Sequence, residues 1–239
     1  MKQEIRFDSY LDDAVLDVAS APTISVTLPI RREGLCGAAW WKLAVKRSLD
    51  IVVSGMGLIV LAPLFLVVGA LVKLTSPGPV FFVQRRVGRD GRPFSMVKFR
   101  SMYRDAHGRR DEHVELNMHR GPIFKVKDDP RITPVGGLIR RLSIDELPQL
   151  VNVLMGDMSL VGPRPCLPEE FRAYGERELQ RLLVKPGITC IWQVSGRSDV
   201  DFDTWVDMDL RYIASWSLLL DFRLLALTLP AVVSGRGAY

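Results

Sequence analysis

The sequence lacks the cysteine pattern of a secreted or zinc-binding protein. Cys36, Cys166 and Cys190 are odd in number and far apart, and no Cys-x-x-Cys occurs in the 239 residues. This argues against a disulfide framework and a structural zinc site, and it favours a reducing, cytosolic setting. Acidic residues between Asp8 and Asp17 also oppose a signal peptide, which needs a basic start followed by an apolar run.

Histidine is scarce as well. His107, His113 and His119 recur every six residues, a step that does not place three imidazoles on one helix face. We therefore expect an exposed excursion here rather than a metal site. Internal repeats and low-complexity tracts are absent, so the length indicates one sizeable domain plus an appendage.

The charge balance is positive. Lysine and arginine exceed the acids to give a net charge of +5, and 48 % of the residues are hydrophobic. A basic chain suits anionic partners such as nucleotides, lipid phosphates and anionic membrane surfaces. Nucleic acid is not expected, because no recognition motif accompanies the charge.

One long stretch carries no charge. As a helix of about 33 Å, residues 51–72 would cross a hydrocarbon core of about 30 Å. Pro63 near the middle breaks or kinks such a helix, and basic flanks tend to stay in the cytoplasm. A spanning helix and a re-entrant hairpin are both open. The basic flanking residues are Lys42, Lys46, Arg47, Lys73, Arg85, Arg86, Arg89 and Arg92.

Residues 80–86 and 93–99 predict a β-hairpin. Both runs are rich in β-formers, and residues 88–92 between them have the composition of a turn. Lys98 lies between apolar neighbours on the second strand. Such a lysine either points into a site or protects an exposed strand edge, and the pattern leaves both interpretations open.

Two adjacent acids close to arginines form the strongest chemical signal. Asp145 and Glu146 follow Arg140 and Arg141, and Arg164 comes next within Gly-Pro-Arg-Pro. Arginine pairs well with carboxylates and with phosphates. In a basic chain with a long apolar segment, this grouping suggests phosphate chemistry at a membrane.

The same acids fit the start of a helix. Ser143 and Glu146 match a capping box, apolar residues follow at helical spacing, and Gly156 predicts the end. The helix dipole would favour ionised acids and nearby phosphate oxygens. The alternative is purely structural: Glu146 only caps, and Asp145 only complements the dipole.

The C-terminal half is predicted to be mainly helical. Trp205, Tyr212 and Trp216 either anchor its helices at a membrane interface or pack in the core. Residues 1–34 show no sustained period and predict a mobile tail with a short helix at 10–18. We expect an amphipathic helix at 168–183, a short strand at 191–194, a polar loop at 195–198, which is a weak phosphate-binding signal, and helices at 202–213 and 217–229.

Several motifs follow one another through residues 42–239. They are KRSLD at 46–50, the Pro-centred apolar segment, VKFRSM at 97–102, LSIDELPQL at 142–150, GDMS at 156–159, GPRP at 162–165, KPGIT at 185–189, QVSGR at 193–197 and WSLLLD at 216–221. This ordered set closely resembles the bacterial sugar transferase family of monotopic phosphoglycosyl transferases. It is most similar to the small exopolysaccharide-priming galactose-phosphate transferase type.

The resemblance implies a reaction. A hexose 1-phosphate passes from a UDP-sugar, with galactose or glucose as candidates, to undecaprenyl phosphate, and UMP is released. It implies that Asp145 is the nucleophile of a ping-pong mechanism and that Glu146 helps to hold Mg²⁺. The implied substrate- and phosphate-binding residues are Lys98, Arg140, Pro163, Arg164, Pro165, Gln193, Arg197 and Asp221.

The resemblance also implies an architecture. The fold is expected to be α+β and mainly helical, with a tail at 1–41 and a re-entrant membrane helix at 42–75 that breaks at Pro63. Residues 76–239 would form a cytosolic catalytic domain with a small β-hairpin and amphipathic interfacial helices. The protein would be monotopic on bacterial inner-membrane lipid, and a homodimer stays open.

Two positions depart from the family pattern. Ala62 replaces the usual serine before the helix-breaking proline, and Cys190-Ile191 stands where Gly-Leu or Gly-Trp is common. Two rival functions use the same residues: a membrane-tethered module that binds anionic ligands without chemistry, and a membrane-anchored hydrolase of nucleotide sugars.

Overall fold

The computed structural model describes residues 2–7, 24–29, 34–106, 129–195 and 201–234. The histidine-containing excursion, the predicted helix at 10–18 and Arg197 lie outside these residues.

Two helices that meet at a bend form the uncharged segment. α1 (Trp40–Val60) and α2 (Ala62–Thr75) join at Leu61 with their axes 60° apart. Pro63 lies in the first turn of α2, where a missing N–H costs least, so it begins a new helix. No helix in the described ranges has by itself the length and apolarity to cross a membrane; only this bent pair meets those two criteria together.

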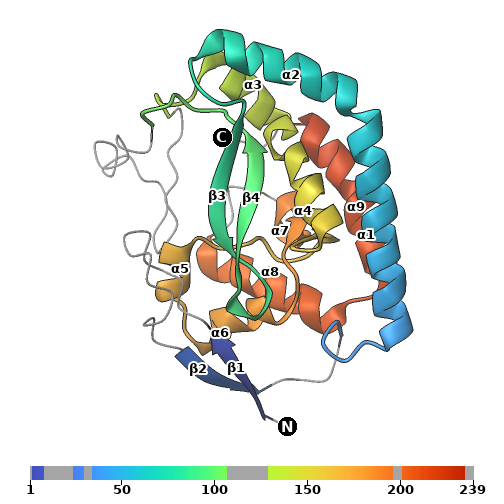
Figure 1. Ribbon diagram of the computed structural model, residues 1–239. Helices are drawn as coiled ribbons and strands as arrows, with labels where there is room; N and C mark the ends of the chain where they lie inside the picture. The colour runs from blue at the N-terminus through green and yellow to red at the C-terminus, as the bar shows by residue number, and fades with distance from the viewer. Residues whose placement is uncertain (1, 8–23, 30–33, 107–128, 196–200, 235–239) are drawn as a thin grey trace.

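α1 runs along one edge of the molecule and α2 along the adjoining edge (Figure 1). Each packs one face on the other elements: α1 buries Asp50 and Ser54, and α2 buries Val68 and Val72. Their remaining faces are apolar and exposed, which is the pattern of a surface that needs another apolar phase. The exposed side chains include Ile51, Val52, Met56, Ile59, Val60, Leu66, Val67, Leu71 and Leu74.

The predicted β-hairpin is confirmed. β3 (Phe81–Val87) pairs antiparallel with β4 (Pro93–Phe99), and a single 3-10 turn, η1 (Arg89–Gly91), joins them. Directly opposed residues share a face, so the pairs Phe82–Lys98 and Arg86–Phe94 place Lys98 and Arg86 on the same face of the hairpin.

Helices and two short strands complete the domain behind the hairpin (Figure 1). The helix at 168–183 is broken into three pieces, and residues 191–194 form a helix where a strand was expected. The elements are α3 (Pro134–Arg141), η3 (Ile144–Gln149), α4 (Leu150–Met155), β5 (Ser159–Val161), α5 (Pro168–Arg172), α6 (Glu176–Leu179), η4 (Gln180–Leu183), β6 (Gly187–Thr189), α7 (Ile191–Ser195), α8 (Phe202–Ser215) and α9 (Leu218–Ser234).

The main core lies between the hairpin, α4, β5 and α8. Phe94, Met96, Val153, Met158 and Tyr212 are among its buried side chains. Tyr212 and Trp216, which the sequence left open between membrane interface and core, are buried, with Tyr212 at 0 % exposure. The helices predicted at 202–213 and 217–229 are confirmed as α8 and α9, and Pro230 lies within α9.

The N-terminal segment contains structure that the sequence did not predict. β1 (Lys2–Phe7) and β2 (Ile24–Pro29) form an antiparallel pair, with Lys2 opposite Pro29 and Phe7 opposite Ile24. The mobility expected for this tail is not tested by the fold.

Candidate active site

The two adjacent acids lie on a 3-10 helix rather than at a capped α-helix start. Ser143 has a left-handed φ of 53°, and its side chain makes no capping hydrogen bond, so the capping-box interpretation is wrong. Pro148 lies within η3, where it cannot donate the backbone bond that an α-helix requires. The Glu146 carboxylate is therefore directed to other partners.

Glu146 is held by two cations from different elements. Lys98 Nζ on β4 lies 2.7 Å from Glu146 Oε1, and Arg164 Nη2 donates to the same oxygen at 3.0 Å. Burial alone would raise the pKa of Glu146, but Arg164 and Lys98 outweigh it and hold the pKa well below the usual range. Glu146 is therefore ionised at neutral pH.

Asp145 has the opposite environment. Its side chain is buried, and it makes no hydrogen bond or ion pair with any described residue. Burial and the neighbouring Glu146 charge raise the pKa of Asp145 to about 6, against the opposing influence of Lys98, Arg140 and Arg164. Two neighbouring carboxyl groups with pKa values moved in opposite directions are typical of a catalytic pair.

The Gly-Pro-Arg-Pro loop positions Arg164. The loop follows β5, which pairs in parallel with β6. Two backbone hydrogen bonds continue this pairing into the loop: Gly162 N donates to Thr189 O at 3.0 Å, and Gly187 N donates to Pro163 O at 2.8 Å. A Cβ on Gly162 would lie 2.6 Å from the Lys185 carbonyl oxygen, so this close approach requires glycine.

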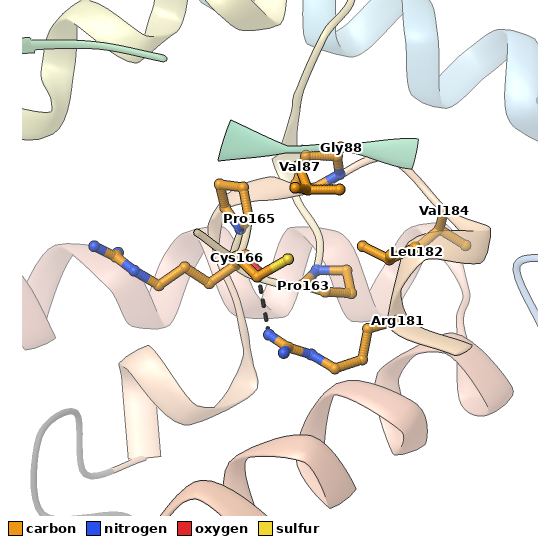
Figure 2. A pocket seen from close by; sticks show the side chains of 10 residues that line it. Val87, Gly88, Pro163, Pro165, Cys166, Arg181, Leu182 and Val184 are labelled. Carbon is orange, nitrogen blue, oxygen red and sulfur yellow. Dashed lines mark hydrogen bonds between the residues drawn. The ribbon is translucent and has the colours of Figure 1, made fainter. Parts of the chain in front are cut away.

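Arg181 holds the same loop by a hydrogen bond to its backbone. Its Nη2 donates to Arg164 O at 3.1 Å, and its Nε donates to Asp209 Oδ2 at 2.9 Å. Figure 2 shows a small pocket beside this contact, with Cys166 and Leu182 among the lining residues. Neither Asp145 nor Glu146 lines this pocket, so the pocket lies beside the loop and is not the reaction centre.

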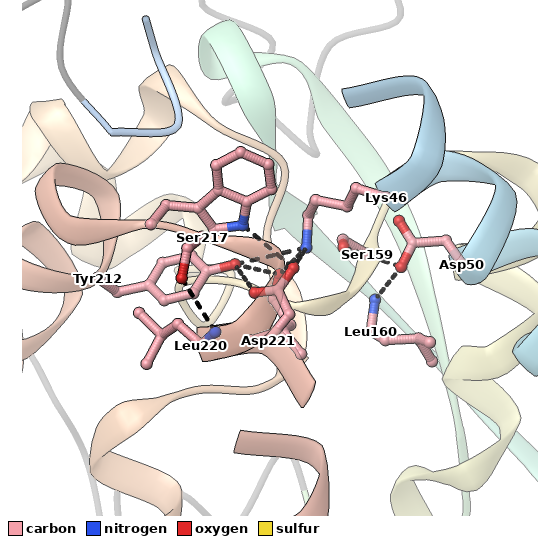
Figure 3. Close-up of polar contacts among 10 residues, drawn as sticks. Lys46, Asp50, Ser159, Leu160, Tyr212, Ser217, Leu220 and Asp221 are labelled. Carbon is pink, nitrogen blue, oxygen red and sulfur yellow. Dashed lines mark hydrogen bonds and ion pairs between the residues drawn. The ribbon is translucent and has the colours of Figure 1, made fainter. Parts of the chain in front are cut away.

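Asp221 lies in a different cluster from the two acids. Lys46 Nζ lies 2.6 Å from Asp221 Oδ2, Tyr212 Oη donates to Oδ1 at 2.7 Å, and Trp216 Nε1 donates to Oδ2 at 3.1 Å (Figure 3). Lys46 Nζ also donates to Val161 O at 3.0 Å, directly before the Gly-Pro-Arg-Pro loop. Asp221 therefore supports the loop through Lys46 and does not contact Glu146 or Arg164.

The KRSLD motif at the start of α1 is likewise engaged with the domain. Asp50 Oδ1 accepts from Leu160 N at 2.9 Å and from Ser159 Oγ at 3.0 Å (Figure 3). Arg47 donates to the carbonyl oxygens of Val153, at 2.6 Å, and Leu154, at 2.8 Å, near the C-terminus of α4. The sequence singled out Arg47 as a membrane flank, but its contacts fix α1 to the domain.

The other expected site residues are placed less closely. Gln193 on α7 accepts from the Cys190 thiol at 3.2 Å, and Cys190 is near enough to Arg164 to influence its pKa. Arg140 at the end of α3 makes no hydrogen bond with a described residue, but it acts on the pKa of Asp145. Pro163 and Pro165 contribute backbone carbonyl oxygens to the loop contacts.

The acids offer oxygen ligands that suit Mg²⁺. The described residues contain no group of three or more histidine, cysteine, aspartate or glutamate side chains close enough to hold a metal. Both cations contact Oε1 of Glu146, so Oε2 has no partner in the described structure, and Asp145 has none either. Two carboxylates plus substrate phosphates are a common set for Mg²⁺, so these residues fit the ion.

Sequence reasoning missed Arg86. It was counted only as a basic flank of the apolar segment, yet it is buried at 9 % exposure and donates to Pro165 O at 3.1 Å. Arg86 is four residues from Phe82, which opposes Lys98. Alternate residues of a strand share a face, so this spacing was the available signal that Arg86 lies on the same face of the hairpin as Lys98.

Comparisons with known proteins place the chain in a family. A family model described as bacterial sugar transferase matches residues 41–235. The chain is 42 % identical over 198 residues to the exopolysaccharide production protein ExoY of Sinorhizobium fredii, a match covering 81 % of this chain and 88 % of that protein.

Larger relatives match a similar share of the chain. The undecaprenyl-phosphate galactose phosphotransferase of Salmonella typhimurium is 44 % identical over 203 residues, covering 82 % of this chain and 42 % of that protein. The undecaprenyl-phosphate glucose phosphotransferase of Komagataeibacter xylinus is 42 % identical over 211 residues, covering 83 % of this chain and 38 % of that protein. The chain belongs to the bacterial sugar transferase family and is therefore a transferase enzyme.

Proposed function

We propose that the protein transfers a hexose 1-phosphate from a UDP-sugar to undecaprenyl phosphate and releases UMP. The observation that carries the proposal is the unpaired, buried Asp145 carboxylate beside Glu146, which Lys98 and Arg164 hold in place. The relatives named for phosphotransfer to undecaprenyl phosphate support the choice of acceptor.

The proposed chemistry consists of two displacements at one phosphorus. An Asp145 oxygen attacks the phosphorus that carries the sugar, and the bond to the bridging oxygen breaks, so UMP leaves with the electron pair. An oxygen of the lipid phosphate then attacks the same phosphorus. The bond to Asp145 breaks, and the carboxylate is regenerated. Covalent catalysis of this kind replaces one difficult encounter with two simpler steps.

The surrounding charges make the first attack feasible. Lys98 and Arg164 place positive charge next to the attacking carboxylate, where it offsets the repulsion between Asp145 and the donor phosphates. Glu146 orients both cations through Oε1. Glu146 Oε2 would hold Mg²⁺ together with the donor phosphates, and the ion would supply further neutralisation of phosphate charge when it is bound.

The proposed location is the cytoplasmic face of the inner membrane. α1 and α2 expose apolar side chains along their outer faces, and the lipid acceptor is itself anchored in the bilayer. We propose that the bent pair enters and leaves the same leaflet and that the catalytic domain stays in the cytosol. Galactose and glucose are the candidate sugars, because both occur in the names of relatives.

A nucleotide-release assay tests the function. Purified protein with undecaprenyl phosphate, Mg²⁺ and either UDP-galactose or UDP-glucose should release UMP with one of the two sugars. EDTA should stop the release, and added Mg²⁺ should restore it. Failure to release UMP from any UDP-sugar tested would remove the proposal.

The same assay separates the rival functions. A hydrolase would release UMP continuously without the lipid, whereas the proposed enzyme should release at most about one UMP per protein molecule until undecaprenyl phosphate is added. A binding module would retain the nucleotide sugar unchanged. Full turnover without the acceptor would favour the hydrolase.

A further inference from the structure

Arg86 lies where the hairpin meets the Gly-Pro-Arg-Pro loop. It extends from β3 on the same face as Lys98, and its Nη1 donates to Pro165 O at 3.1 Å, one residue after Arg164. Its Nη2 donates to Gln84 Oε1 at 2.8 Å. The side chain is therefore fixed beside the residues that hold Glu146.

The guanidinium of Arg86 is incompletely satisfied. It carries five N–H donors, and the described residues provide two acceptors, neither of which is charged. Its Nε is buried and has no partner among the described residues. The nearby buried carboxylate of Glu170 accepts instead from Leu167 N at 2.9 Å and forms no ion pair with Arg86.

The local charge balance is positive. Lys98, Arg164 and Arg86 are three largely buried cations, and Glu146 is the acid that pairs with two of them. Burial, followed by the like charge of Arg164, lowers the pKa of Arg86 to about 10, so it stays charged at neutral pH. A buried charge without a counter-ion is costly, and this arrangement therefore calls for an anion.

The position along the strand indicates which anion. Arg86 is four residues from Phe82, which opposes Lys98, a separation of about 13 Å along the backbone. Lys98 contacts Glu146 next to the attacking Asp145, so Arg86 lies displaced from the reaction centre along the hairpin. The charged groups lie closer together than this, because the Arg86 charge acts on the pKa of Lys98 and the Arg164 charge acts on the pKa of Arg86. Two linked phosphates of a donor could therefore contact these cations side by side, with the leaving nucleotide farther from the nucleophile.

We propose that Arg86 is a further substrate-binding residue, which contacts the phosphate of the donor that departs with the nucleoside. This inference rests on the proposed function. It assigns Arg164 and Lys98 to the phosphorus under attack and Arg86 to the leaving nucleoside monophosphate. Pro165 O and Gln84 Oε1 hold the guanidinium while its remaining N–H groups donate to phosphate oxygens.

Calorimetric titration of the full-length protein with UMP tests the assignment. Arg86→Gln should weaken UMP binding by at least about tenfold, because a charged hydrogen bond to phosphate is lost. Arg86→Lys should weaken binding by about three- to tenfold, since it keeps the charge but loses the planar fork. The matched control is Arg85→Gln, on the exposed opposite face of β3, which should stay within about twofold of the wild type.

Thermal melting of the free proteins accompanies each titration. A folded Arg86→Gln variant that binds UMP as tightly as the wild type would overturn the assignment. If that variant does not fold, unchanged UMP affinity in Arg86→Lys would overturn it equally. A wild-type protein that neither binds UMP nor releases it from a UDP-sugar would instead remove the proposed function.

Discussion

At the scale of single residues, two neighbouring carboxyl groups acquire different properties from their partners. Glu146 accepts from Lys98 and Arg164 and stays ionised, whereas Asp145 is buried without a hydrogen-bond partner in the described structure. An unpaired carboxylate keeps its lone pairs for attack. A paired one is a poorer nucleophile but a good organiser of charge, so the geometry favours Asp145 over Glu146 as the group that reacts.

Asp145→Asn should abolish turnover while the protein still folds. The amide cannot form the acyl phosphate, so we expect a loss of about three to five orders of magnitude in UMP release. Wild-type protein incubated with donor alone should gain the mass of one phosphosugar on Asp145 by peptide mass spectrometry, and the variant should not. Near-normal activity in Asp145→Asn would exclude this residue as the nucleophile.

The same substitution should stabilise the protein at neutral pH. Folding raises the pKa of Asp145 to about 6 from its ordinary value of 3.8, so the folded state binds this proton more tightly. The stability that this group contributes is therefore present at low pH and is lost as pH rises from about 4 to about 6. Asp145→Asn should raise the free energy of unfolding, measured with denaturant, by about 1–3 kcal/mol at pH 7.5. The difference from the wild type should vanish near pH 4. An equal or lower stability at pH 7.5 would contradict the burial of an unpaired charge.

The pH dependence of catalysis follows from the same pKa. In the free enzyme, kcat/KM should fall about tenfold per pH unit below about 6, because protonated Asp145 cannot attack. Steady-state rates measured from pH 5 to pH 8 at fixed Mg²⁺ would show this. A kcat/KM profile that is flat down to pH 5 would contradict a raised Asp145 pKa in the free enzyme.

The sequence pattern showed which residues are adjacent, but it did not show their contacts. Asp145 and Glu146 are adjacent in the sequence, and the local pattern around them indicated a capping role for Glu146. Its actual partners, Lys98 and Arg164, come from distant segments, so no local pattern could show them. Asp221 was expected with the substrate phosphates, and its hydrogen bonds to Lys46, Tyr212 and Trp216 give it a supporting position that no local pattern reveals.

At the scale of elements, the long helices and the hairpin were predictable, whereas short pieces were not. Periodicity correctly indicated α8, α9 and β3–β4, because each has enough residues to show an apolar face. Residues 191–194, expected as a strand, lie in the helix α7, and the strand β6 comes just before them in the sequence. A segment of three to five residues has no readable period, so its partners decide its form: β6 exists because β5 pairs with it.

The contact between α1 and α9 should prove important for the fold. Lys46 Nζ and Asp221 Oδ2 are 2.6 Å apart, with side chains about nine-tenths buried, and Lys46 also binds Val161 O. Lys46→Met should lower the free energy of unfolding by about 3–5 kcal/mol, because it leaves the Asp221 charge buried without its cation. Lys42→Met, on the exposed part of the same helix, should change it by less than about 0.5 kcal/mol.

A double substitution checks that this loss comes from the pair. Lys46→Met combined with Asp221→Leu should recover part of the stability in denaturant unfolding of the detergent-solubilised protein, since the unpaired charge is gone. Strictly additive losses would show that the two side chains act independently. UMP release should fall in Lys46→Met as well, because Val161 precedes the loop that carries Arg164.

At the scale of the whole molecule, both limbs of the bent pair pack on one catalytic domain. Arg47 and Asp50 near the start of α1 bind α4 and β5, and Val72 near the end of α2 packs with Phe99. A helix that crossed the bilayer between these contacts would separate its start from the domain. The contacts therefore favour re-entrance over spanning, an alternative that charge and length had left open in the sequence.

Cysteine labelling in intact cells tests this topology. In a background without Cys36, Cys166 and Cys190, cysteines placed at Lys42 and Arg92 should both resist a membrane-impermeant thiol reagent, because both exposed positions would face the cytosol. Both should react once the cells are opened, while a cysteine of a periplasmic protein reacts in either case. A cysteine at Leu66, on the exposed apolar face of α2, should stay unreactive throughout if that face lies in lipid. Labelling of the Lys42 position alone in intact cells would show that the pair spans the membrane.

Pro63→Leu should move the Lys42 position toward that result, because Ala62 offers no hydroxyl to satisfy a freed carbonyl and the break depends on the proline.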